Sequence, residues 1–180
     1  MNDGLIPSRY AKALYKLAVE NGDCDEIYEQ LRALSTRYTA IDELKRVMIN
    51  PYIPAEEKGR VMLLAAGAKP GSSLDKFILL IIRNNRAEFL RKIALSYVDL
   101  YREKHNIAKV EITTAAEMPE KEIQAILDIV KNKLGDGVTL EVTTEVDPEL
   151  IGGFTVTIGD VLLDASVKNE LKKLRLNLLS

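Results

Sequence analysis

The chain has 180 residues, which is enough for one ordinary domain or two small ones. Its 25 basic and 27 acidic residues give a net charge of -2, which argues against a general electrostatic grip on nucleic acid. One cysteine and one histidine cannot form an internal disulfide or a zinc site of the usual Cys/His kind.

Helical signals dominate from Pro7 to about residue 104. Pro7 suits a first helical position, and apolar residues follow it at helical spacing as far as Gly22. Further helical patterns follow, separated by breakers such as Asn50-Pro51. Six short helices with brief connections predict an antiparallel six-helix bundle over residues 1–104.

The first of these helices carries two apolar stripes. One stripe, at helical spacing, consists of Tyr10, Leu14 and Leu17, supported by Ala13 and Ala18. The second and shallower stripe consists of Ala11, Leu14, Tyr15 and Ala18. Together they give more apolar width than a peripheral helix needs, and the small side chains of the second stripe would let a visiting helix approach closely. We therefore predict that the second stripe contributes to a partner-binding groove.

The fifth helical segment is apolar nearly all round, because it contains the run from Phe77 to Ile82. That run is far shorter than the roughly 20 residues that span a bilayer, so direct membrane insertion is not expected. Ser72 and Asp75 resemble a capping box at its start, with Asp in place of the usual Glu or Gln. Such a helix is either the central one of the bundle or leaves one face for a partner. The bundle core is the favoured interpretation, and a groove wall for an amphipathic helix is the alternative.

After His105-Asn106 the period of the apolar residues changes from helical to alternating. Alternation predicts strands at 108–113, 138–142, 154–158 and 161–163, and helical spacing predicts helices at 119–134 and from about residue 166. The order β-α-β-β-β-α is typical of a small α+β domain over residues 105–180. The fold class is therefore mainly α with a small α+β domain, and the domain boundary is expected near residue 105.

Turn-forming residues punctuate the stretch from 147 to 174. Gly152 and Gly153 allow positive φ or a close backbone approach. We interpret them as a structural turn and not as a phosphate cradle, because they precede a strand and no Lys-Ser/Thr follows them. Gly159 and Asp160 predict a tight hairpin reversal, whose turn type the sequence leaves open.

The last helix is expected to begin at a cap provided by Asp164 or Ser166. Its apolar stripe consists of Val167, Leu171, Leu174 and Leu178. We expect this stripe to complete the small domain. Basic residues flank it at Lys168, Lys172 and Arg175, which is typical of a solvated face and, as the alternative, of a docking surface for an acidic partner helix.

No catalytic constellation is recognisable in the sequence. His105 has no nucleophile motif near it and is interpreted as a solvated linker residue. Cys24 lies between Asp23 and Asp25, whose charges would raise the pKa of the thiol and so oppose a reactive thiolate. We therefore expect neither an enzyme nor a bound cofactor or metal.

A series of short motifs occurs in one order along nearly the whole chain. These motifs are Ser8-Arg9-Tyr10-Ala11-Lys12-Ala13-Leu14, Asn50-Pro51, Phe77 to Ile82 with Asn85-Arg86, Thr113-Thr114-Ala115, Val146-Asp147-Pro148-Glu149-Leu150-Ile151-Gly152-Gly153, Ile158-Gly159-Asp160 and Asp164-Ala165-Ser166-Val167. In this order they resemble the delta subunits of bacterial F-type ATP synthase, relatives of the mitochondrial oligomycin-sensitivity-conferring protein. Ala165 departs from the glycine that is frequent in the family, which affects only the local turn.

The resemblance implies a stator subunit without an active site. In the family, the amino-terminal bundle binds the amino-terminal helix of an alpha subunit in a groove formed by its first and fifth helices. The carboxyl-terminal domain meets the membrane-anchored b subunits, so that the link resists the torque of the rotor. Transferred by helical phase, the groove residues expected here are Ala11, Leu14, Tyr15, Ala18, Leu79 and Ile82.

The first residues, MNDGLIPSRY, lack the features of a secretory signal or a transit peptide. The resemblance therefore implies a bacterial subunit that lies peripherally on the cytoplasmic face of the plasma membrane. The alternative function is a free-standing helical adaptor or regulatory protein that binds an amphipathic partner helix. An acidic isoelectric point of about 5.6 gives little support to a nucleic-acid-binding adaptor.

Overall fold

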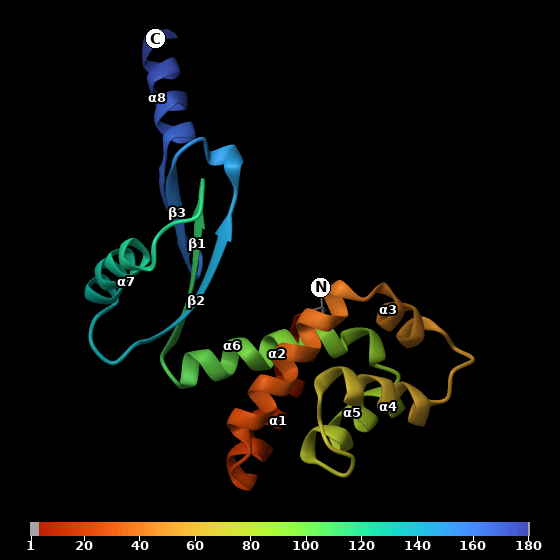
Figure 1. The fold of residues 1–180 in the computed structure, drawn as a ribbon. Helices are drawn as coiled ribbons and strands as arrows, with labels where there is room; N and C mark the ends of the chain where they lie inside the picture. Colours follow the sequence, from red (N-terminus) through yellow and green to blue (C-terminus); the bar gives the residue numbers. More distant parts are fainter. Residues whose placement is uncertain (1–3, 180) are drawn as a thin grey trace. The chain divides into compact units, whose positions relative to one another are not determined.

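The computed structural model describes residues 4–179 and divides the chain into two compact units, residues 1–104 and residues 105–180. We call them the N-terminal unit and the C-terminal unit. In its described part, the N-terminal unit consists of helices (Figure 1). Their bounds are α1 Leu5–Asn21, α2 Cys24–Ala40, α3 Asp42–Ile49, α4 Ala55–Ala66, α5 Ser73–Arg83, the 3₁₀ turn η1 Ala87–Phe89, and α6 Leu90–Lys104.

The core of the N-terminal unit lies around α6, which packs along both α1 and α2. Ile93, Ala94 and Tyr97 of α6 have no exposed surface. By contrast, α5 packs on α4 and over a shorter stretch on α1, and its Leu80 is 50% exposed. Because Leu74, Ile78 and Ile81 of α5 have no exposed surface, α5 contributes to the core, as the favoured interpretation has it, and the face around Leu80 is left open.

The start of α5 is capped largely as its sequence predicts. The Ser72 hydroxyl oxygen accepts a hydrogen bond from the Asp75 amide at 3.3 Å. The Asp75 carboxylate accepts one from the Gly71 amide at 2.8 Å, one residue earlier than in the standard reciprocal box. The shorter Asp side chain therefore still satisfies an amide ahead of the helix.

The C-terminal unit contains a four-stranded mixed sheet. Its elements are β1 Ile107–Thr114, α7 Glu120–Leu134, β2 Thr139–Val146, the 3₁₀ turn η2 Pro148–Leu150, β3 Gly153–Ile158, β4 Val161–Ser166 and α8 Val167–Leu179. The strand order is β2-β1-β3-β4, with β1 and β2 parallel and the other neighbours antiparallel. Because parallel neighbours need a crossover, α7 carries the chain from β1 to β2.

Helix α7 lies beside the sheet (Figure 1), and an apolar layer of side chains joins the two. Val110 and Ile112 of β1 and Val156 of β3 are at most 2% exposed. They pack with Ile126 and Val130 of α7, which lie one helical turn apart. This alternation in the strands and helical spacing in α7 are the patterns that the sequence predicts.

The glycine pair before β3 is required by close packing against the end of β4 and the start of α8. Gly153 has a φ of +75°, and a Cβ at this position would lie 2.2 Å from the Ala165 carbonyl oxygen. A Cβ on Gly152 would lie 2.9 Å from a methyl group of Val167. Neither position therefore has room for a Cβ without a shift of its neighbours.

The hairpin turn joins β3 and β4 through two residues, because Ile158 pairs with Val161. Gly159 has a φ of +56°, whereas Asp160 is not among the residues with positive φ. Positive φ at the first central residue alone is the pattern of a type II′ turn, which twists in the same sense as the strands. The glycine-first order in the sequence follows from this turn type.

Ser166 caps α8, and Asp164 orients the cap. The Ser166 hydroxyl oxygen accepts a hydrogen bond from the Asn169 amide at 3.2 Å. The same hydroxyl donates to the Asp164 carboxylate at 2.6 Å, and the Ser166 amide donates to that oxygen at 2.9 Å. These two hydrogen bonds from Ser166 favour the ionised form and hold the pKa of the Asp164 carboxyl below its usual range.

Asp164 is expected to make the free energy of unfolding of the C-terminal unit decrease as the pH falls. Because its pKa is lower in the folded than in the unfolded state, its stabilising effect is complete above the unfolded pKa of about 4. The effect is lost as the pH falls through the lower, folded pKa. Asp164→Asn should therefore be less stable than wild type at pH 7, and the difference should shrink below pH 4.

Urea unfolding of the two proteins at pH 7, 4 and 3, followed by circular dichroism, measures this difference. Asp160→Asn, on the same hairpin, is the matched control and should show no such convergence. If Asp164→Asn stays equally destabilised at pH 3, the carboxylate does not act through its charge.

Candidate functional site

An apolar groove lies between α1 and α5. It has a volume of about 300 Å³ and is lined by Arg9, Tyr10, Ala13, Leu14, Leu17, Phe77 and Leu80. Leu14 is 1% exposed and forms its floor, whereas Leu17 and Leu80 are 39% and 50% exposed on its two sides. The groove therefore presents large aliphatic side chains to solvent on both of its helices.

Tyr10 holds one wall of the groove in place. Its ring meets Phe77 of α5 edge to face, with the ring centres 6.1 Å apart. Its hydroxyl accepts hydrogen bonds from Arg86 at 2.9 Å and from Asn84 at 3.1 Å, both in the connection that follows α5. The Arg86 guanidinium also lies 5.3 Å from the centre of the Tyr10 ring. The wall is therefore preformed and not a mobile side chain.

In the structure the second stripe of α1 is buried, and residues of the first stripe line the groove instead. Ala11, Leu14 and Ala18 are at most 1% exposed, so the predicted partner stripe is buried inside the N-terminal unit. Tyr15, half-buried, lies 6.0 Å from the ring of Tyr97 in α6. The small side chains do allow a helix to approach closely, but that helix is α6 of the same chain.

The two predicted groove residues of α5, Leu79 and Ile82, lie against α4 and not in the groove between α1 and α5. Leu79 approaches Gly59 of α4 so closely that a Cβ on that glycine would lie 2.7 Å from a Leu79 methyl group. Ile82 lies beside the same glycine and is 6% exposed. Of the six predicted groove residues, only Leu14 lines the groove that the structure shows.

The residues of this groove that the prediction does not include are Tyr10, Ala13 and Leu17 of the first α1 stripe, together with Arg9, Phe77 and Leu80. The sequence shows Tyr10, Ala13 and Leu17 as part of an apolar stripe, but the prediction does not place them in the partner groove. Periodicity identifies two faces of a helix but does not say which one another helix of the same chain will cover. The small size of Ala11 and Ala18 is the sequence feature that could have identified the buried face, because small side chains favour close packing of two helices, here of α1 against its neighbours in the N-terminal unit.

A second exposed apolar surface runs along α8. Val167, Leu171 and Leu174 are 38%, 51% and 57% exposed, and α8 contacts mainly β4 and η2. The helix continues from the end of β4 beyond the sheet (Figure 1). The expectation that this stripe completes the small domain is therefore wrong, because the core layer is already closed by α7. Leu178 lies among the residues whose side chains the structure does not describe.

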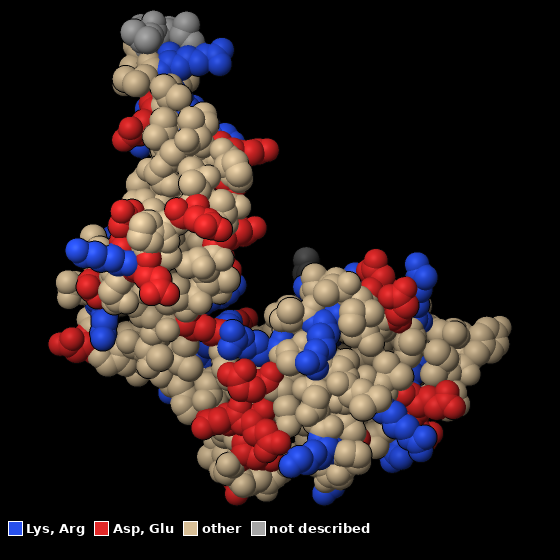
Figure 2. Space-filling view, in the orientation of Figure 1, with Lys and Arg blue, Asp and Glu red and all other residues tan. Residues whose placement is uncertain are grey.

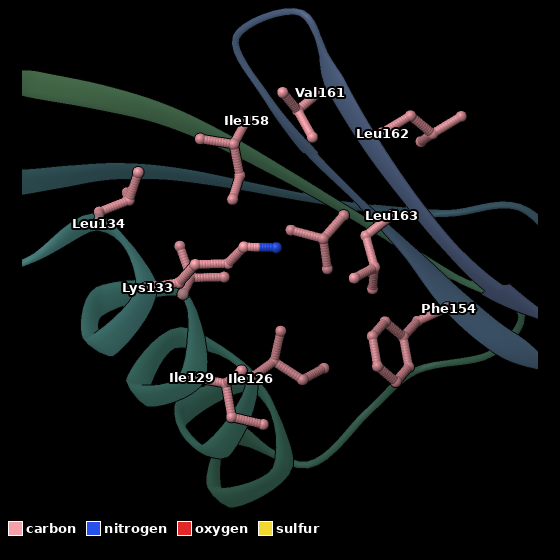
Figure 3. Close-up of a pocket in the computed structure, with 11 residues that line it drawn as sticks. Ile126, Ile129, Lys133, Leu134, Phe154, Ile158, Val161, Leu162 and Leu163 are labelled. Carbon is pink, nitrogen blue, oxygen red and sulfur yellow. The ribbon is translucent and has the colours of Figure 1, made fainter.

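A third apolar surface is a cavity of about 490 Å³ between α7 and the β3–β4 hairpin (Figure 3). Its lining is aliphatic and aromatic except for one charged side chain, Lys133. The lining residues are Ile126, Ile129, Val130, Lys133, Leu134, Phe154, Val156, Ile158, Val161, Leu162 and Leu163. The alternation in the sequence predicts that Phe154, Val156 and Ile158 share one face of a strand, and all three line this cavity.

The one cysteine, Cys24, is held in its thiol form. Burial, with the charges of Asp23 and Asp25, raises the pKa of the Cys24 thiol, which disfavours a thiolate. Within residues 4–179, no group of His, Cys, Asp and Glu side chains could hold a metal ion, and no helix is long and apolar enough to span a bilayer. On the face drawn in Figure 2, basic side chains are scattered among acidic and uncharged ones. The arrangement can dock other proteins, chiefly through apolar surfaces.

Comparisons with known proteins point to one family over nearly the full length of the chain. The family model described as ATP synthase delta (OSCP) subunit matches residues 6–178. The chain is 39% identical over 173 residues to an ATP synthase subunit delta of Phocaeicola vulgatus, covering 96% of this chain and 92% of that one. It is 34% identical over 185 residues to an ATP synthase subunit delta of Parabacteroides distasonis, covering 99% and 98%.

The fold also matches a solved structure. A chain of the mitochondrial ATP synthase hexamer of Toxoplasma gondii superposes with a TM-score of 0.70 at 18% identity, over 97% of each chain. At that identity the match shows the fold alone, whereas the family model and the relatives show descent. The chain belongs to the ATP synthase delta (OSCP) subunit family, whose members are non-catalytic components of the peripheral stalk.

Proposed function

We propose that this chain links two partners within the stator of an F-type ATP synthase. The N-terminal unit, an antiparallel six-helix bundle in this proposal, holds the amino-terminal helix of an alpha subunit in the α1–α5 groove. The C-terminal unit docks on the b subunits. The complex lies on the cytoplasmic face of the bacterial plasma membrane, and the chain resists the torque that the rotor exerts on the catalytic head.

The single observation that carries this proposal is the preformed groove between α1 and α5. Amphipathic helices bind in grooves of this kind, with apolar anchors at i, i+3, i+4 and i+7. Leu17 and Leu80 offer such anchors a flanking apolar surface, and Leu14 offers a buried floor. Because Tyr10 is already fixed by Arg86 and Asn84, little side-chain entropy is lost when a helix binds.

Arg9 adds a charge preference to the groove. It is the only charged residue in the lining of the groove as described for residues 4–179. An incoming helix with a carboxylate beside its apolar anchors would complement this guanidinium, and electrostatic complementarity favours specificity and fast association.

The C-terminal unit supports the second half of the proposal with its uncovered apolar surfaces. The α8 stripe and the cavity beside α7 each bring several exposed apolar side chains together. Single exposed apolar residues are common on protein surfaces, whereas contiguous patches mark interaction sites. A unit of 76 residues (105–180) that leaves such surfaces open is suited to a helical partner.

Titration of the full chain with a peptide of the alpha amino-terminal helix tests the groove. We expect one-to-one binding, with NMR shift changes concentrated on α1 and α5, and none with a scrambled peptide of the same composition. Binding that shifts other faces instead would contradict the assignment.

Capture of partners from solubilised membranes separates the stator from a free-standing adaptor. A tagged chain should recover the alpha, beta and b subunits of the ATP synthase together. An adaptor with the same groove would bind an amphipathic helix without recovering the b subunits, and that result would favour the alternative function.

A further inference from the structure

The cavity beside α7 is formed by two walls of different origin. One wall is a helical stripe in which Ile126, Ile129, Val130, Lys133 and Leu134 follow one another at spacings of three, one, three and one. The other wall is the β3–β4 hairpin, where Val156 pairs with Leu163 and Ile158 pairs with Val161. Residues directly opposite on paired strands point to the same side of a sheet, so these four side chains face α7 together.

The rims of this cavity extend its apolar surface beyond the enclosed volume. Ile129 on the helical wall is 69% exposed, and Val161 and Leu163 on the hairpin wall are 64% and 49% exposed. A small molecule inside a space of about 490 Å³ would leave most of this rim in water. An occupant that covers both rims must be longer than the cavity, as a helix of another protein is.

Lys133 gives this surface a charge preference. Its side chain extends from α7, with the amine toward the space between the helix and the hairpin (Figure 3). Among the described residues no carboxylate forms an ion pair with it, whereas Lys109 and Lys168 each have one. If an apolar partner surface covers the Lys133 amine, the loss of its hydration opposes binding unless the partner supplies an opposite charge.

We propose that the cavity between α7 and the β3–β4 hairpin holds an amphipathic helix of the stalk partner. That helix presents aliphatic side chains at i, i+3 or i+4, and i+7, with one Asp or Glu placed to pair with Lys133. The inference rests on the proposed docking of the C-terminal unit on the b subunits, and it selects one of the unit's two apolar surfaces as the main site.

The cavity is a better helix site than the α8 stripe for a geometric reason. Its walls are concave and are fixed by the sheet and by the buried layer under α7. The α8 stripe is one face of a single helix, which contacts mainly β4 and η2. A helix lying in the cavity buries apolar surface on two sides, whereas a helix lying on α8 buries it on one.

Calorimetric titration of the full chain with the extramembrane segment of the b subunit from the same organism tests the site. Ile129→Asp and Lys133→Glu should each weaken binding at least tenfold. Lys131→Glu is the matched control on α7, because Lys131 lies away from the cavity and carries the same charge change. It should change the affinity less than threefold at the same ionic strength.

Leu171→Asp on α8 tests the competing surface and should weaken binding less than Ile129→Asp does. Circular dichroism and thermal midpoints within a few degrees of wild type would show that the exposed substitutions leave the fold intact. Lys133→Met should also flatten the salt dependence of the affinity that wild type shows, because it removes the charge and keeps the aliphatic part of the side chain.

Each contrary outcome has a separate meaning. No binding of b by the wild-type chain would overturn the proposed docking function itself. Normal binding by Ile129→Asp and Lys133→Glu, with loss in Leu171→Asp, would overturn this inference and keep the docking function. Self-association of the chain that Ile129→Asp abolishes would also overturn it, and would assign the cavity to a second copy.

Discussion

Gly153→Ala is expected to lower the free energy of unfolding of the C-terminal unit by at least about 3 kcal/mol at neutral pH. Two effects add at this position. The φ of +75° is unfavourable for any residue with a Cβ, and the new methyl group would overlap the backbone carbonyl oxygen of Ala165 at 2.2 Å. Neither can relax cheaply, because β3 pairs with β4 at this point through Gly153 and Ser166.

The size of this effect is large relative to the unit. A unit of 76 residues (105–180) is stabilised by roughly 4–11 kcal/mol in all. Hydrogen exchange measured by mass spectrometry should be faster in the core strands of residues 105–180 of the variant than in the same strands of the wild type. Exchange in residues 5–104 should change little, because these residues form a separate compact unit.

Gly159→Ala is the matched control for this prediction. Gly159 also has positive φ, but a Cβ there would meet no atom within 4 Å. The control therefore isolates the cost of the backbone conformation, about 1–2 kcal/mol, from the cost of the overlap. If the two variants lose equal stability in urea unfolding, the close approach of β4 to Gly153 is not what requires the glycine.

Ala13→Trp is expected to weaken binding of the alpha amino-terminal peptide at least 100-fold. Ala13 lies in the lining of the α1–α5 groove and is exposed, so an indole there would occupy the space that an incoming helix needs. The stability of the chain should change by no more than about 0.5 kcal/mol, because no buried contact is lost. Fluorescence anisotropy with a labelled peptide measures the affinity.

Two further substitutions on α1 give this prediction its controls. Lys12→Trp places the same side chain on an exposed position outside the groove lining and should leave the affinity unchanged. Ala18→Trp places it where no surface is exposed and should destabilise the chain by about 1–3 kcal/mol or more, through overpacking. Full affinity in the Ala13→Trp variant would rule out this groove as the peptide site.

Local signals in the sequence were sufficient for much of the secondary structure. Breakers and caps such as Gly22, Asn50-Pro51 and Ser72 act within a few residues, and the helices end or begin beside them in the structure. The order of strands and helices after residue 105 likewise follows from changes in period and from turn residues. Local signals could not predict the order of the strands in the sheet, because β1 pairs with both β2 and β3, which lie far from it in the chain.

For the candidate site, too, the sequence determined some features and the tertiary structure decided others. The sequence alone determined that α1 has two apolar faces, that α5 has apolar surface to spare, that glycines are required around β3 and that the chain resembles the delta subunits. Only the tertiary structure decided that Ala11 and Ala18 are buried, that Tyr10 and Leu17 line the groove, and that the α8 stripe stays exposed. The physical reason is that periodicity records which side chains avoid water, whereas the neighbour that covers them is fixed by packing between distant segments.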